Sequence, residues 1–317
     1  MLRVFLLILP LLTGLAQAAP HTILQRPLEL DTGSGVLHGT LLLPQSPTPV
    51  PVALLIAGSG PTDRDGNNPN GGHNDSLKRL AQVLAKHGIA SLRYDKRGVA
   101  RSLAAAPREE DLSLEAYVAD AAAWGQLLRA DPRFAQLTLI GHSEGALVAS
   151  LAAEPAGAQA LVAIAGSARP IDQVLREQLE GRLPAPLYAY ALLVIDRLKA
   201  GERQPVVPDA LQVLLRPSVQ PYLISLFRQD PVAAFAHLRI PTLILQGRND
   251  MQIGVADAEA LKAAKPDSQL VLVDGMNHML RIAPADKARQ LASYNDPSLP
   301  LARLLSEQII RFIQQRP

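Results

Sequence analysis

Short apolar runs alternate along the chain with stretches whose apolar residues recur at helical spacing. Each run is short enough for one strand, and the runs lie at residues 36–43, 52–56, 89–94, 137–140, 161–165, 242–245 and 270–273. Helical spacing appears at residues 75–87, 114–130, 145–153 and 301–313, and Asp111 or Ser113 is expected to cap the second of these helices. Because strands that alternate with helices form parallel sheets, the pattern predicts a mostly parallel, doubly wound α/β sheet with helices on both faces.

Residues 168–238 interrupt this alternation, because they hold no run that resembles a strand. Prolines divide the segment into helix-like pieces, and a structureless loop of this length is uncommon in a compact domain. We therefore predict a helical insertion between two parts of one core, residues 19–167 and 239–317. The insertion follows the carboxyl end of the strand at 161–165, so it is expected over that edge of the sheet.

Residues 1–18 have the pattern of a signal peptide. Arg3 gives a positive start, an apolar run follows at 4–15, and small residues at 16–18 favour cleavage after Ala18. The run is too short to span a bilayer, which needs about 20 apolar residues. We expect an exported protein, periplasmic or secreted, with no stable membrane insertion once this segment is removed.

Composition narrows the classes of function. The 317 residues include no cysteine, which excludes disulfides, thiolate zinc sites and a cysteine nucleophile. Lysine and arginine number 31 against 29 acidic residues, so the net charge of +2 gives no sign of a nucleic-acid partner. An exported chain without cysteine suits a bacterial periplasm. The sequence leaves the oligomeric state open.

The pentapeptide GHSEG at residues 141–145 has the form GxSxG and lies between a predicted strand and a predicted helix. A strand that turns sharply into a helix presents the central serine alone at the carboxyl edge of the sheet. The start of the helix also favours developing negative charge. Ser143 is therefore the candidate nucleophile.

A serine nucleophile needs a histidine that accepts its proton and a carboxylate that orients this histidine. In folds with this turn the chain order is serine, acid, histidine. His278 follows the last predicted strand, whereas His237 precedes a strand and so lies at the opposite edge. Asp250 follows the preceding strand and is the preferred acid. Asp274 is the alternative, but it lies only four positions before His278, which leaves little chain to wrap round the imidazole.

The glycine loop after the strand at 52–56 is the candidate oxyanion hole. Acyl transfer needs two peptide N–H groups aimed at the developing negative charge. One is expected from Glu144, which follows the nucleophile, and the other from Ser59, with Gly60 as the alternative. The loop lacks the lysine of a phosphate-binding loop and the glycine and glutamate of a calcium loop, so no metal site is expected.

Charged residues follow two strands of the predicted sheet. Asp63 and Asp65 lie in the glycine loop, and Lys96 and Arg97 follow the strand at 89–94. We expect Asp63 or Asp65 to pair with Lys96 or Arg97 and so to brace the loop beside the site. The alternative is a solvated cluster of charges that contributes about 0–1 kcal/mol.

Four segments, GHSEG, GSGPTDRDGN, YDKRGVARS and QGRND…NH, together resemble the α/β-hydrolase superfamily. Within it they are similar to bacterial serine carboxylesterases whose oxyanion loop reads GSGPxDRDG. The resemblance implies the α/β-hydrolase fold with residues 168–238 as a lid, no cofactor, and a small-molecule ester of short or medium chain as substrate. It also implies Ser143 as nucleophile, Asp250 as acid and His278 as base. Ala100 departs from the pattern, because it replaces the second glycine of DxRGxGxS.

Several alternatives stay open at this point. The same three groups cleave peptides, thioesters and lactones, so the fold does not decide among these substrates. A relative that binds a ligand without turning it over is a further alternative, although the ordered Ser143, Asp250 and His278 argue against it. Apolar side chains of the insertion are expected partly on the core and partly around an acyl pocket above Ser143: Leu187, Tyr188, Tyr190, Leu192, Leu193 and Ile195.

Overall fold

The computed structural model describes residues 22–315 of the chain. The predicted signal peptide, residues 1–18, lies outside the described residues. Within residues 22–315, no helix combines the length and the apolar character that crossing a membrane requires.

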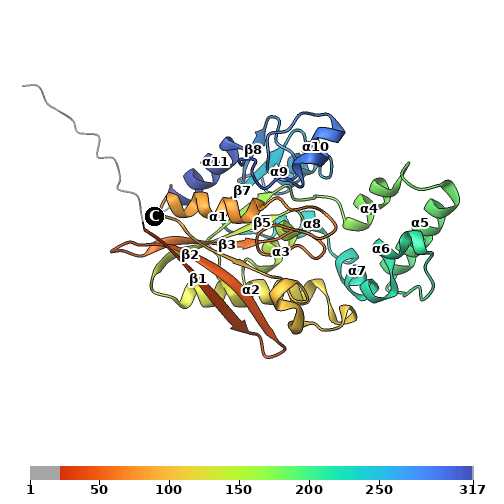
Figure 1. The fold of residues 1–317 in the computed structure, drawn as a ribbon, viewed down its shortest axis with the longest axis horizontal. Coiled ribbons are helices and arrows are strands. Elements are labelled where there is room, and N and C mark those ends of the chain that lie inside the picture. The colour runs from red at the N-terminus through yellow and green to blue at the C-terminus, as the bar shows by residue number, and fades with distance from the viewer. Residues whose placement is uncertain (1–21, 316–317) are drawn as a thin grey trace, which may run out of the picture.

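In the described part of the chain, eight strands form one sheet in the order β1-β2-β4-β3-β5-β6-β7-β8 (Figure 1). β2 runs antiparallel to β1 and β4, and all other neighbours are parallel. The predicted α/β-hydrolase fold, with a mostly parallel sheet, is therefore confirmed. The strands are β1 (Ile23–Asp31), β2 (Val36–Pro44), β3 (Val50–Ile56), β4 (Ala90–Tyr94), β5 (Phe134–His142), β6 (Ala160–Ile164), β7 (Thr242–Gly247) and β8 (Gln269–Val273).

Helices cover both faces of this sheet (Figure 1). α1 and α11 pack against each other on one face, whereas α2, α3, α8 and α9 form a connected layer on the other. The second predicted helix begins as expected, because the Ser113 hydroxyl accepts a hydrogen bond from Ala116 N at 3.1 Å. The α-helices are α1 (Ser76–Lys86), α2 (Leu114–Ala130), α3 (Glu144–Ala152), α4 (Ile171–Leu179), α5 (Ala185–Lys199), α6 (Gln212–Leu215), α7 (Gln220–Phe227), α8 (Pro231–Ala236), α9 (Val255–Ala264), α10 (Lys287–Ser293) and α11 (Arg303–Gln314).

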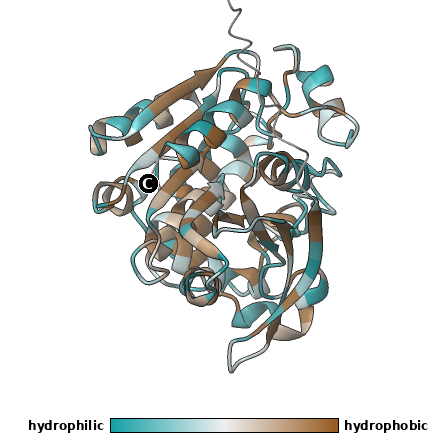
Figure 2. Ribbon diagram, turned by 90° about the vertical axis from the view of Figure 1, so that its left-hand side faces the viewer, coloured by the Kyte–Doolittle hydropathy of each residue, from teal (hydrophilic) through white to brown (hydrophobic). Residues whose placement is uncertain are grey.

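Two apolar clusters fill the space between the sheet and its helices. On β3, Leu54 joins the cluster that contains Trp124 of α2, whereas Leu55 joins the cluster that contains Leu80 of α1. Figure 2 shows the central strands as mostly hydrophobic and the helices around them as mixed. Strands buried on both faces are apolar at successive positions, which is why they appear in the sequence as continuous apolar runs.

β1 is the strand that the apolar pattern did not reveal. It lies at the edge of the sheet and pairs with β2 along its whole length. Most of its side chains are exposed or half-buried, so the strand carries no apolar run. An edge strand held by backbone pairing with one neighbour leaves little trace in hydrophobic periodicity.

Residues between β6 and β7 form five α-helices, α4 to α8, and α4 to α7 lie at the right of the molecule in Figure 1. Ala191, Val194 and Ile195 of α5 are fully buried and belong to the same apolar cluster as α2 and α3. Ser225 of α7 accepts a hydrogen bond from the N–H of Leu114 at 2.8 Å. The segment is therefore joined to the core by apolar packing and by a hydrogen bond to the first turn of α2.

Candidate active site

Ser143 lies at a sharp turn between β5 and α3. Its backbone angles are φ 56° and ψ −124°, a sparsely populated combination for a residue with a side chain. Two glycines make the turn feasible, because a Cβ at Gly141 would lie 2.1 Å from Gly145 O, and one at Gly145 would lie 2.3 Å from Ile56 O. The Ser143 N–H donates to Ile164 O at 2.9 Å. The turn therefore presents Ser143 at the carboxyl end of β5.

The loops after β7 and β8 bring Asp250 and His278 together. His278 Nδ1 lies 2.7 Å from Asp250 Oδ2, and both side chains are almost fully buried. Asp250 Oδ1 accepts hydrogen bonds from the N–H groups of Gln252 and Ile253 at 2.8 and 3.0 Å. Burial opposes ionisation of this carboxyl, but His278 and the two N–H groups outweigh burial and lower the pKa of Asp250. An ionised Asp250 keeps a proton on His278 Nδ1, which leaves Nε2 able to accept one.

The two rejected alternatives lie elsewhere. The Asp274 side chain is 91% exposed and pairs with Arg248 at 2.9 Å. His237 is exposed, and its Nδ1 lies 2.6 Å from Ala233 O in the preceding turn of α8. The structure thus brings Asp250, and not Asp274, to the imidazole of His278.

His142 is a site residue to which the sequence assigned no role. Its Nε2 lies 2.9 Å from His278 O, and the two imidazole rings are 4.8 Å apart between centroids. Because a carbonyl oxygen can only accept, Nε2 carries the proton and donates it. Burial, together with the nearby His278, lowers the pKa of His142 to about 3, so the ring is neutral at ordinary pH. His142 therefore ties the backbone of His278 to the end of β5.

Peptide N–H groups near Ser143 are free to bind an oxyanion. Gly58 lies against the nucleophile, because a Cβ added there would be 3.1 Å from Ser143 Cβ. Within residues 22–315, the N–H groups of Ser59, Gly60 and Glu144 donate no hydrogen bond. The structure therefore leaves available both N–H groups that the sequence proposed and also the alternative at Gly60.

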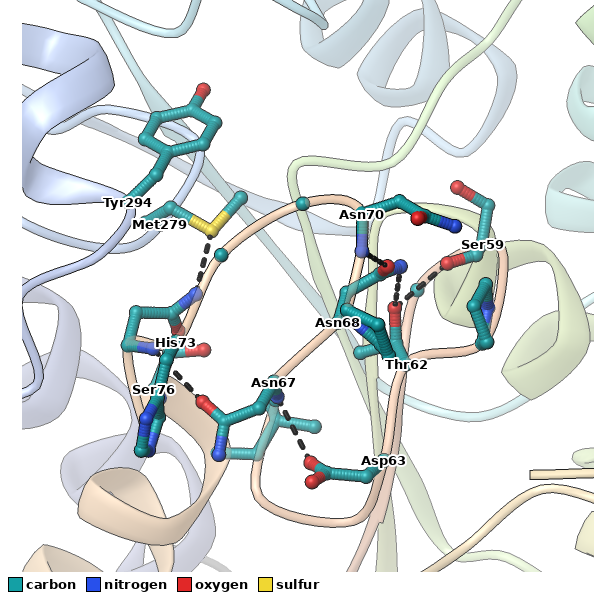
Figure 3. A pocket seen from close by; sticks show the side chains of 18 of the residues that line it. Ser59, Thr62, Asp63, Asn67, Asn68, Asn70, His73, Ser76, Met279 and Tyr294 are labelled. Atoms are coloured by element: carbon teal, nitrogen blue, oxygen red, sulfur yellow. Dashed lines mark hydrogen bonds between the residues drawn. The ribbon is translucent and has the colours of Figure 1, made fainter. Parts of the chain in front are cut away.

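The Asp63 side chain forms hydrogen bonds within its own loop. Its Oδ1 accepts hydrogen bonds from the N–H groups of Asp65 and Asn67 at 2.8 and 2.9 Å (Figure 3). The expected pairing of Asp63 with Lys96 or Arg97 is therefore wrong. The N–H groups two and four residues after Asp63 bind its carboxylate within the turn. These local hydrogen bonds compete with an ion pair to a residue on another strand.

Asparagines complete the internal bonding of this loop, residues 57–76, which we call the oxyanion loop. Asn67 Oδ1 accepts from the N–H groups of Asn74 and Asp75 at 2.8 and 2.9 Å. Asn68 Nδ2 donates to Thr62 Oγ1 at 2.9 Å, and Figure 3 shows these side chains turned toward their own backbone. The loop is thus held by hydrogen bonds from its own side chains, without a regular element.

The other predicted charge pairs are also replaced by different ones. Asp65 pairs with Arg93 at 3.0 Å, and Arg97 pairs with Asp120 of α2 at 2.6 Å. Lys96 donates to backbone carbonyl oxygens of the oxyanion loop. Arg93 reaches Asp65 from within β4, whereas Arg97 lies beyond the strand end and beside α2. The charges do join neighbouring elements, but with partners that spacing along the chain could not identify.

A cavity of about 1060 Å³ opens beside Ser143 and His278. Its walls come from the oxyanion loop, from residues 98–103, and from Met279 and the end of α10, where Figure 3 shows Met279 and Tyr294 opposite the loop. No residue between 168 and 238 lines it, so the prediction that apolar side chains of the insertion surround this pocket is wrong. Within the insertion, Ile195 is buried and Leu193 is half exposed.

Comparison with known proteins agrees with the fold. The model of the alpha/beta hydrolase family matches residues 33–291. The chain belongs to this family. Among curated family relatives, Esterase EstD of Thermotoga maritima is 29% identical over 256 residues. That match covers 80% of this chain and 60% of EstD, so the chain spans less than two thirds of that relative's length.

Solved structures with low sequence identity to this chain share its fold. Est1E from Butyrivibrio proteoclasticus, solved with ferulic acid bound, is 16% identical with a TM-score of 0.59, over 91% of this chain and 100% of Est1E. An esterase of Pyrococcus furiosus is also 16% identical, with a TM-score of 0.61 over 92% of this chain and 91% of that protein. At this identity the likeness concerns the fold alone.

Proposed function

We propose that this protein is a carboxylesterase-type serine hydrolase that works through an acyl-enzyme. Ser143 is the nucleophile, His278 the base and Asp250 the residue that orients His278. The observation that carries the proposal is the 2.7 Å contact between His278 Nδ1 and Asp250 Oδ2, because it lies beside a strained Ser143 that lines the same cavity. The esterase name of EstD supports the same class of reaction.

The proposed reaction begins when Ser143 Oγ attacks the ester carbonyl carbon and its proton passes to His278 Nε2. The carbonyl oxygen becomes an oxyanion that accepts hydrogen bonds from the N–H groups of Glu144 and Ser59. When the intermediate collapses, the alcohol leaves with the proton from Nε2. Water then attacks the acyl-enzyme by the same route and releases the carboxylic acid, so the cycle requires no cofactor.

The chemistry of the cavity supports uncharged esters as substrates. Its lining contains no lysine or arginine and a single carboxylate, Asp63, whose Oδ1 is already bonded to its own loop. An anionic ligand such as a phosphorylated thioester would find no cationic side chain there. We propose esters of short or medium acyl chain, with room in the cavity for both the acyl group and the alcohol. For its location we propose export, on the pattern of residues 1–18.

The experiment that tests the function is Ser143→Ala, with Ser150→Ala as the matched control. Ser150 lies on α3 and its hydroxyl donates to Ala146 O, so it shares the helix but not the cavity. We expect Ser143→Ala to lower ester hydrolysis by at least about a thousandfold and to abolish labelling by a fluorophosphonate, while Ser150→Ala keeps both. Near wild-type activity of Ser143→Ala would overturn the proposal.

A panel of nitrophenyl esters of increasing chain length, with a thioester, a lactone and an aminoacyl anilide, tests the substrate class. We expect the highest kcat/KM on a short or medium ester. Highest activity on the anilide would indicate a peptidase, and highest activity on long emulsified esters would contradict the proposed chain length.

A further inference from the structure

Lys96 is a buried cation whose hydrogen-bond partners are peptide carbonyl groups, and its Nζ also lies 5.3 Å from the centroid of the Tyr117 ring. It follows β4, and only 3% of its surface is exposed. Its Nζ donates to Gly58 O at 2.5 Å and to Gly60 O at 2.8 Å. Among the described residues, no carboxylate lies within ion-pair distance of Nζ. Burial of an ammonium group is costly unless it is paired and hydrogen-bonded, so this arrangement requires an explanation.

The two accepting carbonyl groups belong to the part of the oxyanion loop that faces Ser143. A peptide group is planar and trans, so the C=O of Gly58 and the N–H of Ser59 point in opposite directions within one rigid plane. When Lys96 holds Gly58 O on one side, it fixes the direction of the Ser59 N–H on the other. The hydrogen bond to Gly60 O holds the loop on the far side of Ser59.

Glu144, the residue after the nucleophile, is a buried acidic residue with no ion-pair partner among the described residues. Its side chain is 6% exposed, and Oε1 has no hydrogen-bond partner among the described residues. Burial lowers the pKa of Lys96, and the negative charge of Glu144 opposes this shift. Burial and the same negative charge raise the pKa of Tyr222 on α7. Glu144 is therefore the acidic residue whose charge acts on the pKa of both Lys96 and Tyr222.

We propose that Lys96 is a positioning residue of the oxyanion hole, which fixes the direction of the Ser59 N–H donor through its hydrogen bonds to Gly58 O and Gly60 O. Lys96 holds the peptide that carries the Ser59 N–H, and Glu144 carries the second N–H on its own backbone. This inference rests on the proposed function. It explains why a lysine occupies a position where an apolar side chain would avoid the cost of burying a charge.

The first test is Lys96→Met, which keeps the length of the side chain and removes the donor. Its matched control is Lys265→Met, because Lys265 is also buried but pairs with Asp267, two residues further on, and does not line the cavity. We expect Lys96→Met to lower kcat on a short ester by about 10- to 100-fold. The loss should not exceed that caused by removing an oxyanion donor itself, because Lys96 acts only by orienting the donor. KM should stay within about threefold, since the donors act mainly in the transition state.

The affinity for a trifluoromethyl ketone, which mimics the tetrahedral oxyanion, separates positioning of the donors from a general effect of Lys96 on the structure. Its affinity for Lys96→Met should fall by the same factor as kcat, while the affinity for the alcohol product stays unchanged. Lys265→Met should alter neither. Wild-type kcat and inhibitor affinity in a folded Lys96→Met would overturn the inference.

The second test covers the case in which Lys96→Met does not fold. Lys96→Ala leaves a space for a small ammonium ion, so we expect propylammonium to restore at least several-fold of the lost kcat. Propanol, which has the size but not the charge, should restore none, and Lys265→Ala should not respond to either. Absence of rescue by propylammonium would overturn the inference.

The wild type and Ser143→Ala, measured in the same assays, distinguish a failure of the proposed function from a failure of the inference about Lys96. If the wild type hydrolyses no ester, or Ser143→Ala is as active as the wild type, the proposed function fails and the inference fails with it. If the wild type is active and Ser143→Ala is not, an unaffected Lys96→Met overturns the inference alone.

Discussion

The oxyanion loop and the insertion both follow the carboxyl end of a parallel strand, yet they are built in opposite ways. The oxyanion loop follows β3, is held by its own carboxylate and amide side chains, and forms a wall of the cavity. Residues 168–238 follow β6, form helices with buried apolar faces, and contribute nothing to that wall. A place at the carboxyl edge therefore does not by itself make a segment part of the site.

The difference follows from where each segment can satisfy its groups. Polar side chains that bond to their own backbone leave a loop free to lie against an open cavity. Amphipathic helices must turn their apolar faces toward one another or toward the core, as Val194 and Ile195 do. The insertion is joined to the core at α2 instead, where Ser225 of α7 accepts a hydrogen bond from the N–H of Leu114.

Asp250→Asn, which alters the contact between the loops after β7 and β8, is expected to have the largest effect on activity. An amide at this position presents an N–H group to His278 or favours the wrong tautomer, so we expect kcat/KM to fall by about 10³- to 10⁴-fold. Asp274→Asn is the matched control, because this exposed carboxylate pairs only with Arg248 at the surface, and it should change kcat/KM by less than twofold. Steady-state kinetics of both variants provide the measurement, and the opposite ranking would reassign the acid.

Asn67→Ala tests whether the internal hydrogen bonds of the oxyanion loop shape the site. It removes the acceptor of two N–H groups, and we expect a fall in unfolding free energy of about 1–3 kcal/mol. Because the loop then loses its shape beside Ser143, kcat should fall by about tenfold or more. Asn70→Ala is the control, since Asn70 is exposed and lines the same cavity. Equal kinetics for the two variants would show that internal bonding does not shape the site.

His142→Gln tests the contact that ties His278 to β5, through the dependence of stability on pH. The unfolded chain binds a proton at His142 near pH 6.5, whereas the folded protein does so only near pH 3. Stability is therefore lost as pH falls through this window, with a slope of up to about 1.4 kcal/mol per pH unit from this residue. Glutamine keeps an N–H donor but does not titrate, so its slope between pH 6 and 4 should be smaller.

Urea denaturation at several pH values measures that slope for the wild type and for His142→Gln. The lowered pKa of Asp250 adds a loss of the same sign at lower pH, as the pH falls through its folded value, and it is common to both proteins. Identical slopes would show that His142 titrates normally. We expect kcat of the variant to fall only several-fold.

Ile195→Ala has the smallest expected effect on activity and the clearest on the insertion. Ile195 is fully buried on α5, so its truncation should lower the free energy of unfolding by about 2–5 kcal/mol. At temperatures where the variant is folded, kcat and KM should remain within about twofold of the wild type, because no residue of the insertion lines the cavity. A large change in KM would indicate that the insertion contributes to substrate binding, unlike the proposed role.

Much of the site could be predicted from local sequence. GHSEG on a strand–helix boundary indicated the turn at Ser143, and chain order selected Asp250 over Asp274, which agrees with the contact to His278. These features depend on neighbours along the chain and on the rule that parallel strands end at one edge. Partners of charged side chains could not be predicted this way, and Asp65, for example, pairs with Arg93 rather than with Lys96 or Arg97.

The alternating apolar runs were enough to predict the sheet except for its edge strand β1, the helices on both faces and the interruption at residues 168–238, because burial on two faces imposes a pattern on each segment separately. Only the tertiary structure decided which groups meet across segments: His142 with the carbonyl of His278, and Lys96 with those of Gly58 and Gly60. It also decided which segment lines the cavity. Periodicity records whether a residue is buried, whereas a contact between distant segments depends on the packing of both, and no local pattern encodes that geometry.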